Sequence, residues 1–145
     1  MKYRKRVLRR LGYTDESDVI QLKGRVACEI STGDELMLTE LIFHGVFNDL
    51  SIAQTVALLS CFVFQEKSNQ EVRMMEELKK PLQVVKDTAR RIAKISMECK
   101  LPVVEDEYVN AFKAELMDVS FAWASVCVLF FYVLCVLIEW LGSQV

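Results

Sequence analysis

The most regular pattern in the chain is a run of mostly apolar positions that alternates steps of three and four residues between positions 75 and 99. The run consists of Met75, Leu78, Leu82, Val85, Ala89, Ile92, Ser96 and Cys99. This spacing places all of them on one helical face, which predicts a long helix whose seam packs along a neighbouring helix. Pro81 lies inside the run, and a proline in a helix interior costs about 3 kcal/mol, so we expect a kink or a fresh helix start there.

Shorter helical patterns occupy most of the remaining chain. Residues 2–11 predict a basic helix that Gly12 ends, and residues 34–47 predict a helix with Ser31 as its N-cap. Capping-box patterns at Ser51–Gln54 and Ser68–Glu71 open a nearly uncharged helix and the long helix, respectively. A last amphipathic helix begins near Tyr108 and is expected to run without a break into the C-terminal tail. Its marker positions are Tyr108, Phe112, Leu116, Val119 and Trp123.

One segment near the N-terminus has a period of two instead. Val26, Cys28 and Ile30 alternate with more polar or smaller residues, and Lys23-Gly24 precedes them as a turn or bulge. The pattern predicts a half-buried strand. The expected fold class is therefore mainly α, a helical bundle with a small β element near the N-terminus.

Charge is distributed unevenly, although the formal net charge is only −2. Six of the first ten residues are Lys or Arg, a further cationic group lies on the long helix, and no Lys or Arg follows Lys113. Spaced cations can track the phosphates of RNA or DNA, whereas the alternative for the long helix is a solvated polar face. The candidate backbone contacts are Lys2, Arg4, Lys5, Arg6, Arg9, Arg10, Lys86, Arg90, Arg91 and Lys94.

Sequence motifs for catalysis are missing. The chain has neither a phosphate-binding glycine-rich loop nor a nucleophile elbow, and its carboxylate pairs lie on polar faces. The five cysteines are widely spaced in apolar surroundings and predict buried free thiols in a reducing compartment. His44, the single histidine, predicts a structural role. We therefore expect no catalytic residue, no metal site and no enzymatic activity from this chain by itself.

The C-terminal tail raises a separate alternative. The segment from Phe121 to Leu141 carries one charge, Glu139, and about 20 apolar residues in a helix suffice to span a bilayer. All basic residues precede it. These features predict a membrane segment that would leave the N-terminus in the cytoplasm.

Residues 1–124, about 85% of the chain, resemble the start of the C-terminal, DSHCT-type region of superkiller-type DExH-box RNA helicases that serve the nuclear exosome. The words that carry the resemblance are "KYRKRVLRRLGY", "DVIQLKGRVACEIS", "ELMLTELIFHGVFNDLS", "ALLSCFVFQE", "ARRIAKIS" and "FKAELMDVSFAWA". The N-terminal words favour the nuclear branch of this family over its cytoplasmic relatives.

The resemblance implies an assignment for each part of the chain. Residues 1–12 would end the returning stalk helix, and residues 13–33 would hold a strand and turn, a winged-helix remnant, that leads into the bundle. Residues 34–124 would form part of the helical bundle, which packs on two RecA-like motor domains, and 125–145 would be a divergent hydrophobic tail. ATP and Mg²⁺ would bind upstream of this chain, and no functional residue of the family can be transferred to it.

The leading interpretation is a truncated helicase C-terminal domain that acts in the nucleus, in nucleoplasm or nucleolus, in RNA processing, rRNA maturation and decay. Its expected partners are RNA, exosome and helicase-cofactor proteins and the family's RecA-like domains. The tail would be a splice or read-through product, and the loss of partner helices would leave the Met75–Cys99 seam partly uncovered. The alternatives are a single-pass tail-anchored membrane protein and a helical protein-interaction module.

Overall fold

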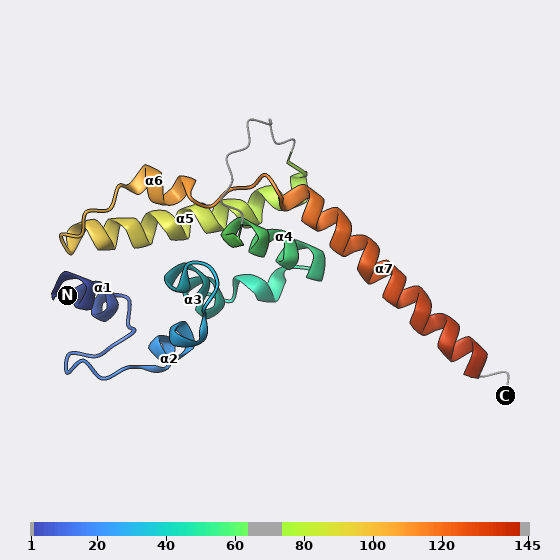
Figure 1. Cartoon of the computed structure of the whole chain (residues 1–145), viewed down its shortest axis with the longest axis horizontal. Coiled ribbons are helices and arrows are strands. Elements are labelled where there is room, and N and C mark those ends of the chain that lie inside the picture. Colours follow the sequence, from blue (N-terminus) through green and yellow to red (C-terminus); the bar gives the residue numbers. More distant parts are fainter. Residues whose placement is uncertain (1, 64–73, 143–145) are drawn as a thin grey trace.

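Helices account for nearly all regular structure in the computed structural model, which describes residues 2–63 and 74–142, with side chains as far as Val133 (Figure 1). The helices are α1 (Lys2–Arg10), α2 (Leu22–Glu29), α3 (Glu35–Phe43), the 3-10 helix η1 (Val46–Asp49), α4 (Ile52–Val63), α5 (Glu76–Glu98), α6 (Glu105–Asn110) and α7 (Met117–Gly142). The mainly α fold class is thus confirmed.

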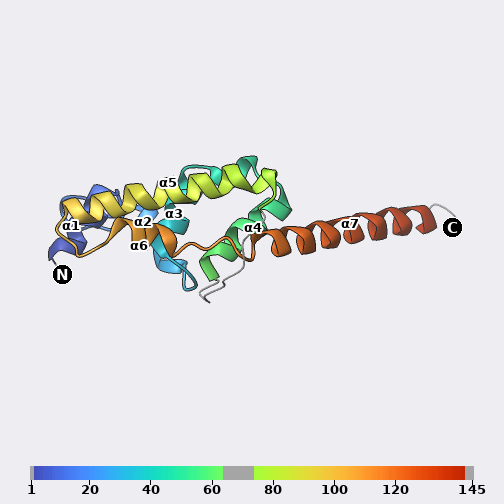
Figure 2. The ribbon, with the colours of Figure 1, turned by 90° about the horizontal axis from the view of Figure 1, so that it is seen from above.

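Helix α5 is the central helix of the bundle. It contacts α1, α3, α4 and α6, which lie along its length (Figures 1 and 2). Helix α7 packs on α4 and then projects away from the other helices, so the two ends of the chain lie at opposite ends of the molecule.

The predicted seam of α5 is the core of the bundle. From Leu78 to Cys99 every seam residue is buried, and only Met75, at the N-cap, is exposed. The side chains packed against this seam come mainly from α3 and α4, with Val109, Phe112 and Met117 closing its far side. The expectation of a partly uncovered seam is therefore wrong for Leu78 to Cys99. Pro81 is buried within α5, which begins before the proline rather than at it.

The predicted strand is wrong, because Leu22–Glu29 forms helix α2. The buried residues are Gly24 and Ala27, three apart, whereas Cys28 is exposed, so the burial period is helical. At Gly24 a Cβ atom would lie 2.5 Å from the Tyr13 carbonyl oxygen, which explains the glycine. A strand also needs a partner for its backbone groups, and β pairing in the described residues is limited to one bridge, Thr14–Ile20.

Helix ends follow the sequence signals in part. Ser51 and Gln54 form the predicted capping box, in which the Ser51 N–H donates to Gln54 Oε1 at 2.9 Å and the Gln54 N–H donates to Ser51 Oγ at 3.2 Å. Gly12 follows α1 with a positive φ of 78°, as a stop signal should. Helix α3 is capped by Asp34 rather than Ser31. The Ser68–Glu71 pattern lies outside the described residues, but the expectation that it opens the long helix is wrong, because α5 begins at Glu76 after the extended N-cap Met75.

The expected unbroken C-terminal helix is also wrong, because α6 ends at Asn110 and α7 begins at Met117. The interruption changes the phase of the helix. Phe112 and Met117 are buried, while Val119 and Trp123 face away from the bundle and are exposed. Interior positions in α7 are occupied by Ala124 and, partly, Phe121.

The segment proposed as a membrane span, Phe121 to Leu141, lies within α7, although its side chains beyond Val133 are outside the described residues. In the part of the chain that could be searched, no helix has both the length and the apolar character needed to cross a membrane.

Candidate nucleic-acid interface

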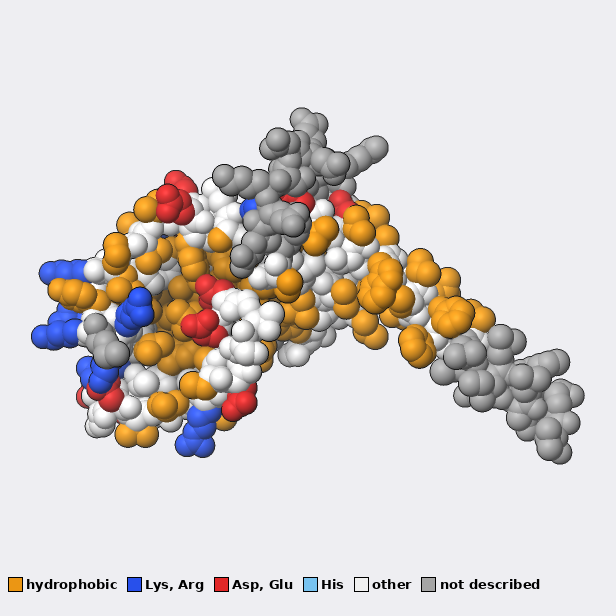
Figure 3. Space-filling model, in the orientation of Figure 1, with side chains coloured by type: hydrophobic (Ala, Val, Ile, Leu, Met, Phe, Trp, Pro, Cys, Tyr) orange, Lys and Arg blue, Asp and Glu red, His pale blue; other side chains and the backbone are white. Residues whose placement is uncertain are grey.

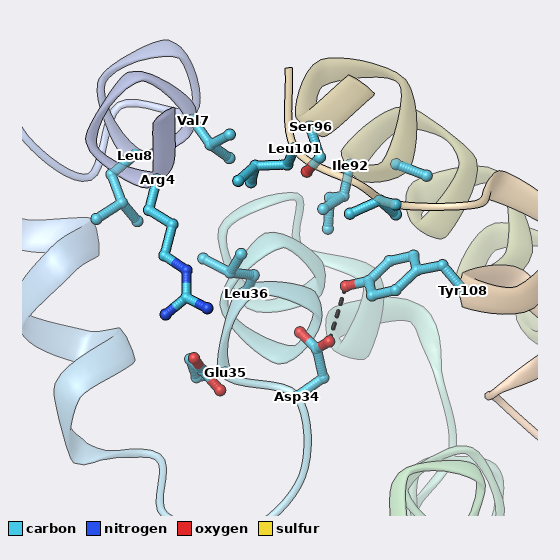
Figure 4. A pocket seen from close by; sticks show the side chains of 12 residues that line it. Arg4, Val7, Leu8, Asp34, Glu35, Leu36, Ile92, Ser96, Leu101 and Tyr108 are labelled. Carbon is cyan, nitrogen blue, oxygen red and sulfur yellow. Dashed lines mark hydrogen bonds between the residues drawn. The ribbon is translucent and has the colours of Figure 1, made fainter. Parts of the chain in front are cut away.

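Helix α1 presents its cations on the surface at one end of the bundle, where blue side chains gather in Figure 3. Val7 and Leu11, on and just after α1, pack against Tyr13, Ala27 and Cys99 in a small second core. With that side anchored, the basic side chains lie on the surface, and that of Arg4 is directed towards Glu35 at the mouth of the cavity between α1, α3 and α5 (Figure 4). All six candidates on α1 are exposed: Lys2, Arg4, Lys5, Arg6, Arg9 and Arg10.

Half of these cations are held by acidic partners. Asp18 accepts from Lys5 Nζ at 2.9 Å and from Arg9 Nη2 at 2.7 Å, and these hydrogen bonds, that from Lys5 first, lower the pKa of the Asp18 carboxyl. Arg10 pairs with Glu98 of α5 at 2.5 Å. The C-terminal half of α1 is consequently partly neutralised.

The N-terminal half of α1 keeps its charge available. Lys2 and Arg4 have no ion pair with any described residue, and the Arg6 guanidinium lies 5.9 Å from the centroid of the Tyr3 ring. A guanidinium beside an exposed aromatic ring remains free to meet a phosphate. These three cations are the strongest backbone candidates on α1.

The candidates on α5 separate into two groups. Lys86, Arg90 and Lys94 recur every four residues and therefore share a face of the helix. Arg90 donates to Asp87 at 2.7 Å, whereas Lys86 and Lys94 have no ion pair within the described residues. Arg91 contacts α3 instead, so the structure does not bring it together with the other three.

Arg91 belongs to a charge cluster around Glu40, whose side chain is only 1% exposed. The Glu40 carboxylate accepts from Arg91 Nη2 at 2.5 Å and forms an ion pair with Lys23 Nζ of α2 at 2.5 Å. The two ring nitrogens of His44 lie 2.6 Å from the Glu40 carbonyl oxygen and 3.0 Å from Arg91 Nη1. The cluster links α2, α3 and α5, so the Arg91 side chain stabilises the packing of these helices rather than lying free for RNA.

The sequence analysis did not find this cluster. Its one signal was a carboxylate at position 40 on the apolar side of a predicted helix, one turn after Met37 and beside Leu41, both fully buried. A buried carboxylate requires cationic or hydrogen-bonding partners. Lys23 and Arg91, which supply them, are distant in the sequence and could not be assigned from it.

A cavity of about 350 Å³ lies between α1, α3 and α5 (Figure 4). Its walls are largely apolar, with Val7, Leu36 and Ile92 among them. On its polar side the Tyr108 hydroxyl donates to Asp34 at 2.8 Å, and burial raises the pKa of Tyr108. Asp34 also accepts from the Met37 N–H and thereby caps α3. Asp34 and Tyr108 thus hold the helices together, while Arg4 and Glu35 also line the cavity (Figure 4).

Metal coordination has no evident place in the part of the molecule that is described. No three His, Cys, Asp or Glu side chains gather there in a way that could hold an ion. Cys61 and Cys99 are buried free thiols, as the sequence predicted, whereas the free thiol Cys28 is exposed and Cys127 is half-buried, so the predicted burial is wrong for these two. Burial, with a smaller effect from Glu115, raises the pKa of Cys61 to about 12.

Comparison with known proteins places these elements in a family. Residues 17–128 match the DSHCT (NUC185) domain. The chain is 64% identical over 122 residues to the ATP-dependent RNA helicase mtr4 of Schizosaccharomyces pombe, covering 83% of the chain and 11% of that protein. It is 57% identical over 125 residues to the human exosome RNA helicase MTR4, covering 86% and 12%.

A plant relative shows the same correspondence. The DExH-box ATP-dependent RNA helicase DExH10 of Arabidopsis thaliana is 51% identical over 125 residues, which cover 86% of this chain and 13% of that protein. The chain thus spans about an eighth of the length of these relatives. The family match includes all helices from α2 to the first half of α7. The chain therefore belongs to the DSHCT domain family, as its resemblance to the exosome RNA helicases indicated.

Proposed function

We propose that the chain serves as the C-terminal helical-bundle region of an ATP-dependent RNA helicase that acts with the nuclear exosome in RNA processing and decay, including rRNA maturation. The observation that carries this proposal is the 57–64% identity to exosome RNA helicases across the described bundle. ATP and Mg²⁺ would be bound by motor domains outside this chain, and the work would take place in the nucleus.

Within such a helicase, residues 1–12 would end the stalk, residues 13–33 would link it to the bundle, and residues 34–124 would pack on the motor domains. Among the ten candidates, those without described ion pairs, four of them exposed and Lys86 half-buried, are the best ones for RNA phosphates, because no acidic partner has to be displaced first. These are Lys2, Arg4, Arg6, Lys86 and Lys94. The remaining five candidates, Lys5, Arg9, Arg10, Arg90 and Arg91, bind acidic side chains and are expected to contribute less.

A domain exchange tests the proposal. Residues 1–124 would replace the matching segment of the fission yeast mtr4 helicase, in cells depleted of their own copy. We expect the chimera to support growth, to prevent accumulation of rRNA precursors and, once purified, to unwind RNA with ATP. The matched control carries Leu58→Asp in the core of α4, where Leu58 is fully buried, and should lose all three.

A charge series in the same chimera tests the phosphate contacts. Lys2→Gln, Arg4→Gln and Arg6→Gln together should weaken RNA binding and lower its salt dependence, since each lost phosphate contact removes up to about 0.7 from the slope for a single strand. The ion-paired set Lys5, Arg9 and Arg10, changed in the same way, should have a smaller effect. A chimera that is folded and hydrolyses ATP but neither unwinds RNA nor restores processing would overturn the proposed function.

A further inference from the structure

The turn between α1 and α2 holds one carboxylate against two cations of α1. One oxygen of Asp18 accepts from Lys5 Nζ at 2.9 Å, and the other accepts from Arg9 Nε at 3.1 Å and Arg9 Nη2 at 2.7 Å. Lys5 and Arg9 are four residues apart and therefore share a face of the helix. A single acidic side chain thus occupies two neighbouring cations, in the half of α1 that precedes the turn.

Hydrogen bonds within the turn hold Asp18 in this place. The Asp15 carboxylate accepts from the backbone N–H groups of Ser17 at 2.8 Å and Val19 at 2.9 Å. The Asp15 N–H donates to the Val19 carbonyl oxygen at 3.0 Å. Asp18 itself has a φ of +63°, a backbone conformation that few residues other than glycine, asparagine and aspartate adopt. The backbone therefore presents Asp18 to α1, whereas two mobile surface side chains would first have to be ordered.

Lys5 and Arg9 are also cations that a nucleic-acid backbone would contact if Asp18 did not hold them. Their side chains remain 56% and 41% exposed, so they lie at the surface that α1 offers to a ligand. We propose that Asp18 is an autoinhibitory contact, in which its carboxylate occupies Lys5 and Arg9 in place of two RNA phosphates. This inference rests on the proposed function and adds a means of regulation: RNA has to displace Asp18 before it reaches the C-terminal half of α1.

The contact is of a kind that RNA can open. Carboxylates and phosphates accept the same charge-assisted hydrogen bonds from Lys and Arg, so they compete for the same donors. The Asp18 side chain is 36% exposed, and exposed ion pairs are weak and screened by salt. Glu40 holds Arg91 in a different way, because its side chain is only 1% exposed and is part of the helix packing. Asp18 thus regulates access, whereas Glu40 stabilises the fold.

Fluorescence anisotropy of the full chain with a labelled oligouridine RNA of about 15 nucleotides tests the competition, at about 0.05–0.2 M KCl. Asp18→Asn removes the charge and keeps the turn, since asparagine readily adopts a positive φ. A phosphate contact with a single strand adds up to about 0.7 to the salt slope, which is about fivefold in affinity at 0.1 M salt. With two cations released, the affinity should rise about 3- to 25-fold and the slope should steepen by up to about 1.4.

Two controls separate the release of cations from a general loss of negative charge. Glu16→Gln removes the same charge from the same turn and from beside Arg9, but Glu16 forms no ion pair with any described residue. It should leave the salt slope unchanged. In a chain that carries Lys5→Gln and Arg9→Gln, Asp18→Asn should bring no gain, because neither cation is left to release. The circular dichroism spectrum should be the same for all variants.

Equal affinities of the wild-type chain and Asp18→Asn would overturn the proposal. A gain that persists without Lys5 and Arg9, or that Glu16→Gln reproduces, would also overturn it, since the effect would then come from long-range charge. Absence of RNA binding by both chains would do so too, because α1 would then offer no cations to compete for. Failure of the competition is distinguishable from failure of the proposed function, because the domain exchange measures rRNA processing and unwinding with Asp18 unchanged.

Discussion

Helices α5 and α7 carry apolar seams of the same heptad-like spacing, but the two seams have opposite surroundings. From Leu78 to Cys99 the seam of α5 is buried under α1, α3, α4 and α6. The seam of α7 is exposed throughout and consists of Val119, Trp123, Val126, Phe130 and Val133. Spacing therefore identifies an apolar helical face, but it shows neither whether that face is covered within the chain nor by which element.

The remaining faces of the two helices differ as well. Helix α5 bears exposed charges opposite its seam, including Glu76, Lys79, Asp87 and Lys94, so its orientation in the bundle is determined. From Val119 to Val133, α7 is uncharged on every side. An apolar helix of this kind has no preferred outer face, and only its contact with α4 and the buried Met117 and Ala124 set its rotation.

One pair of substitutions gives the largest contrast between the two seams. Val85→Asp on α5 would bury an unpaired carboxylate at a fully buried position, at a cost of about 4 kcal/mol or more. That is a large share of a typical stability of about 5–15 kcal/mol. Val126→Asp on α7 should change the stability of the monomer by less than about 0.5 kcal/mol.

Urea unfolding of dilute protein, followed by circular dichroism, measures the change in the free energy of unfolding for both variants. Val126→Leu serves as an apolar control at the α7 position. If Val126→Asp destabilised the monomer as strongly as Val85→Asp, the α7 seam would belong to the bundle core and the comparison would fail.

A second substitution tests what holds α5 against α3. Glu40→Gln removes the buried charge that binds Arg91 and Lys23, and should cost about 2–3 kcal/mol. We expect less than the about 3–5 kcal/mol of a fully buried pair, since the Arg91 side chain is 44% exposed and can return to water. Glu76→Gln, which affects only the exposed pair with Lys79, should change stability by less than about 0.5 kcal/mol.

The same urea titration applies to Glu40→Gln and Glu76→Gln. Equal stabilities of the two variants would show that the Glu40 cluster contributes no more than a surface ion pair. No such cluster exists on α7 between Val119 and Val133, because that stretch has no charged residue to form one.

The sequence predicted elements well where one long period dominates. The α5 seam, the basic helix α1 and the capping box at Ser51 were all correct, because each depends on neighbours within the same segment. The strand was wrong because period two and period 3.6 are hard to distinguish over eight residues. The helical period becomes evident only from the burial of Gly24 and Ala27, and Gly24 packs against Tyr13 of a separate segment, which the local pattern does not show.

The predicted buried face of the C-terminal helix was also wrong, again because a feature outside the local pattern determined it. Tyr108, Phe112, Leu116, Val119 and Trp123 fit one helical face only if the helix is continuous, and the interruption between Asn110 and Met117 turns the later residues outward. At the candidate interface the cations themselves were evident in the sequence. Their pairing was not, because Asp18 reaches Lys5 and Arg9 through a turn in which Asp18 has a φ of +63°.

The reactivity of two thiols, Cys61 and Cys127, tests the difference between the two helices without any substitution. Cys61 of α4 is buried against the α5 seam with a pKa raised to about 12, so at pH 8 it is both protonated and covered. Cys127 of α7 is partly exposed. With dilute protein and iodoacetamide at pH 8, followed by peptide mass spectrometry, Cys127 should react at least about 100-fold faster than Cys61. In 8 M urea the two rates should converge, because unfolding removes the cover. Comparable rates without urea would mean that α4 separates readily from α5, and that the seam of α5 is no better covered than the seam of α7.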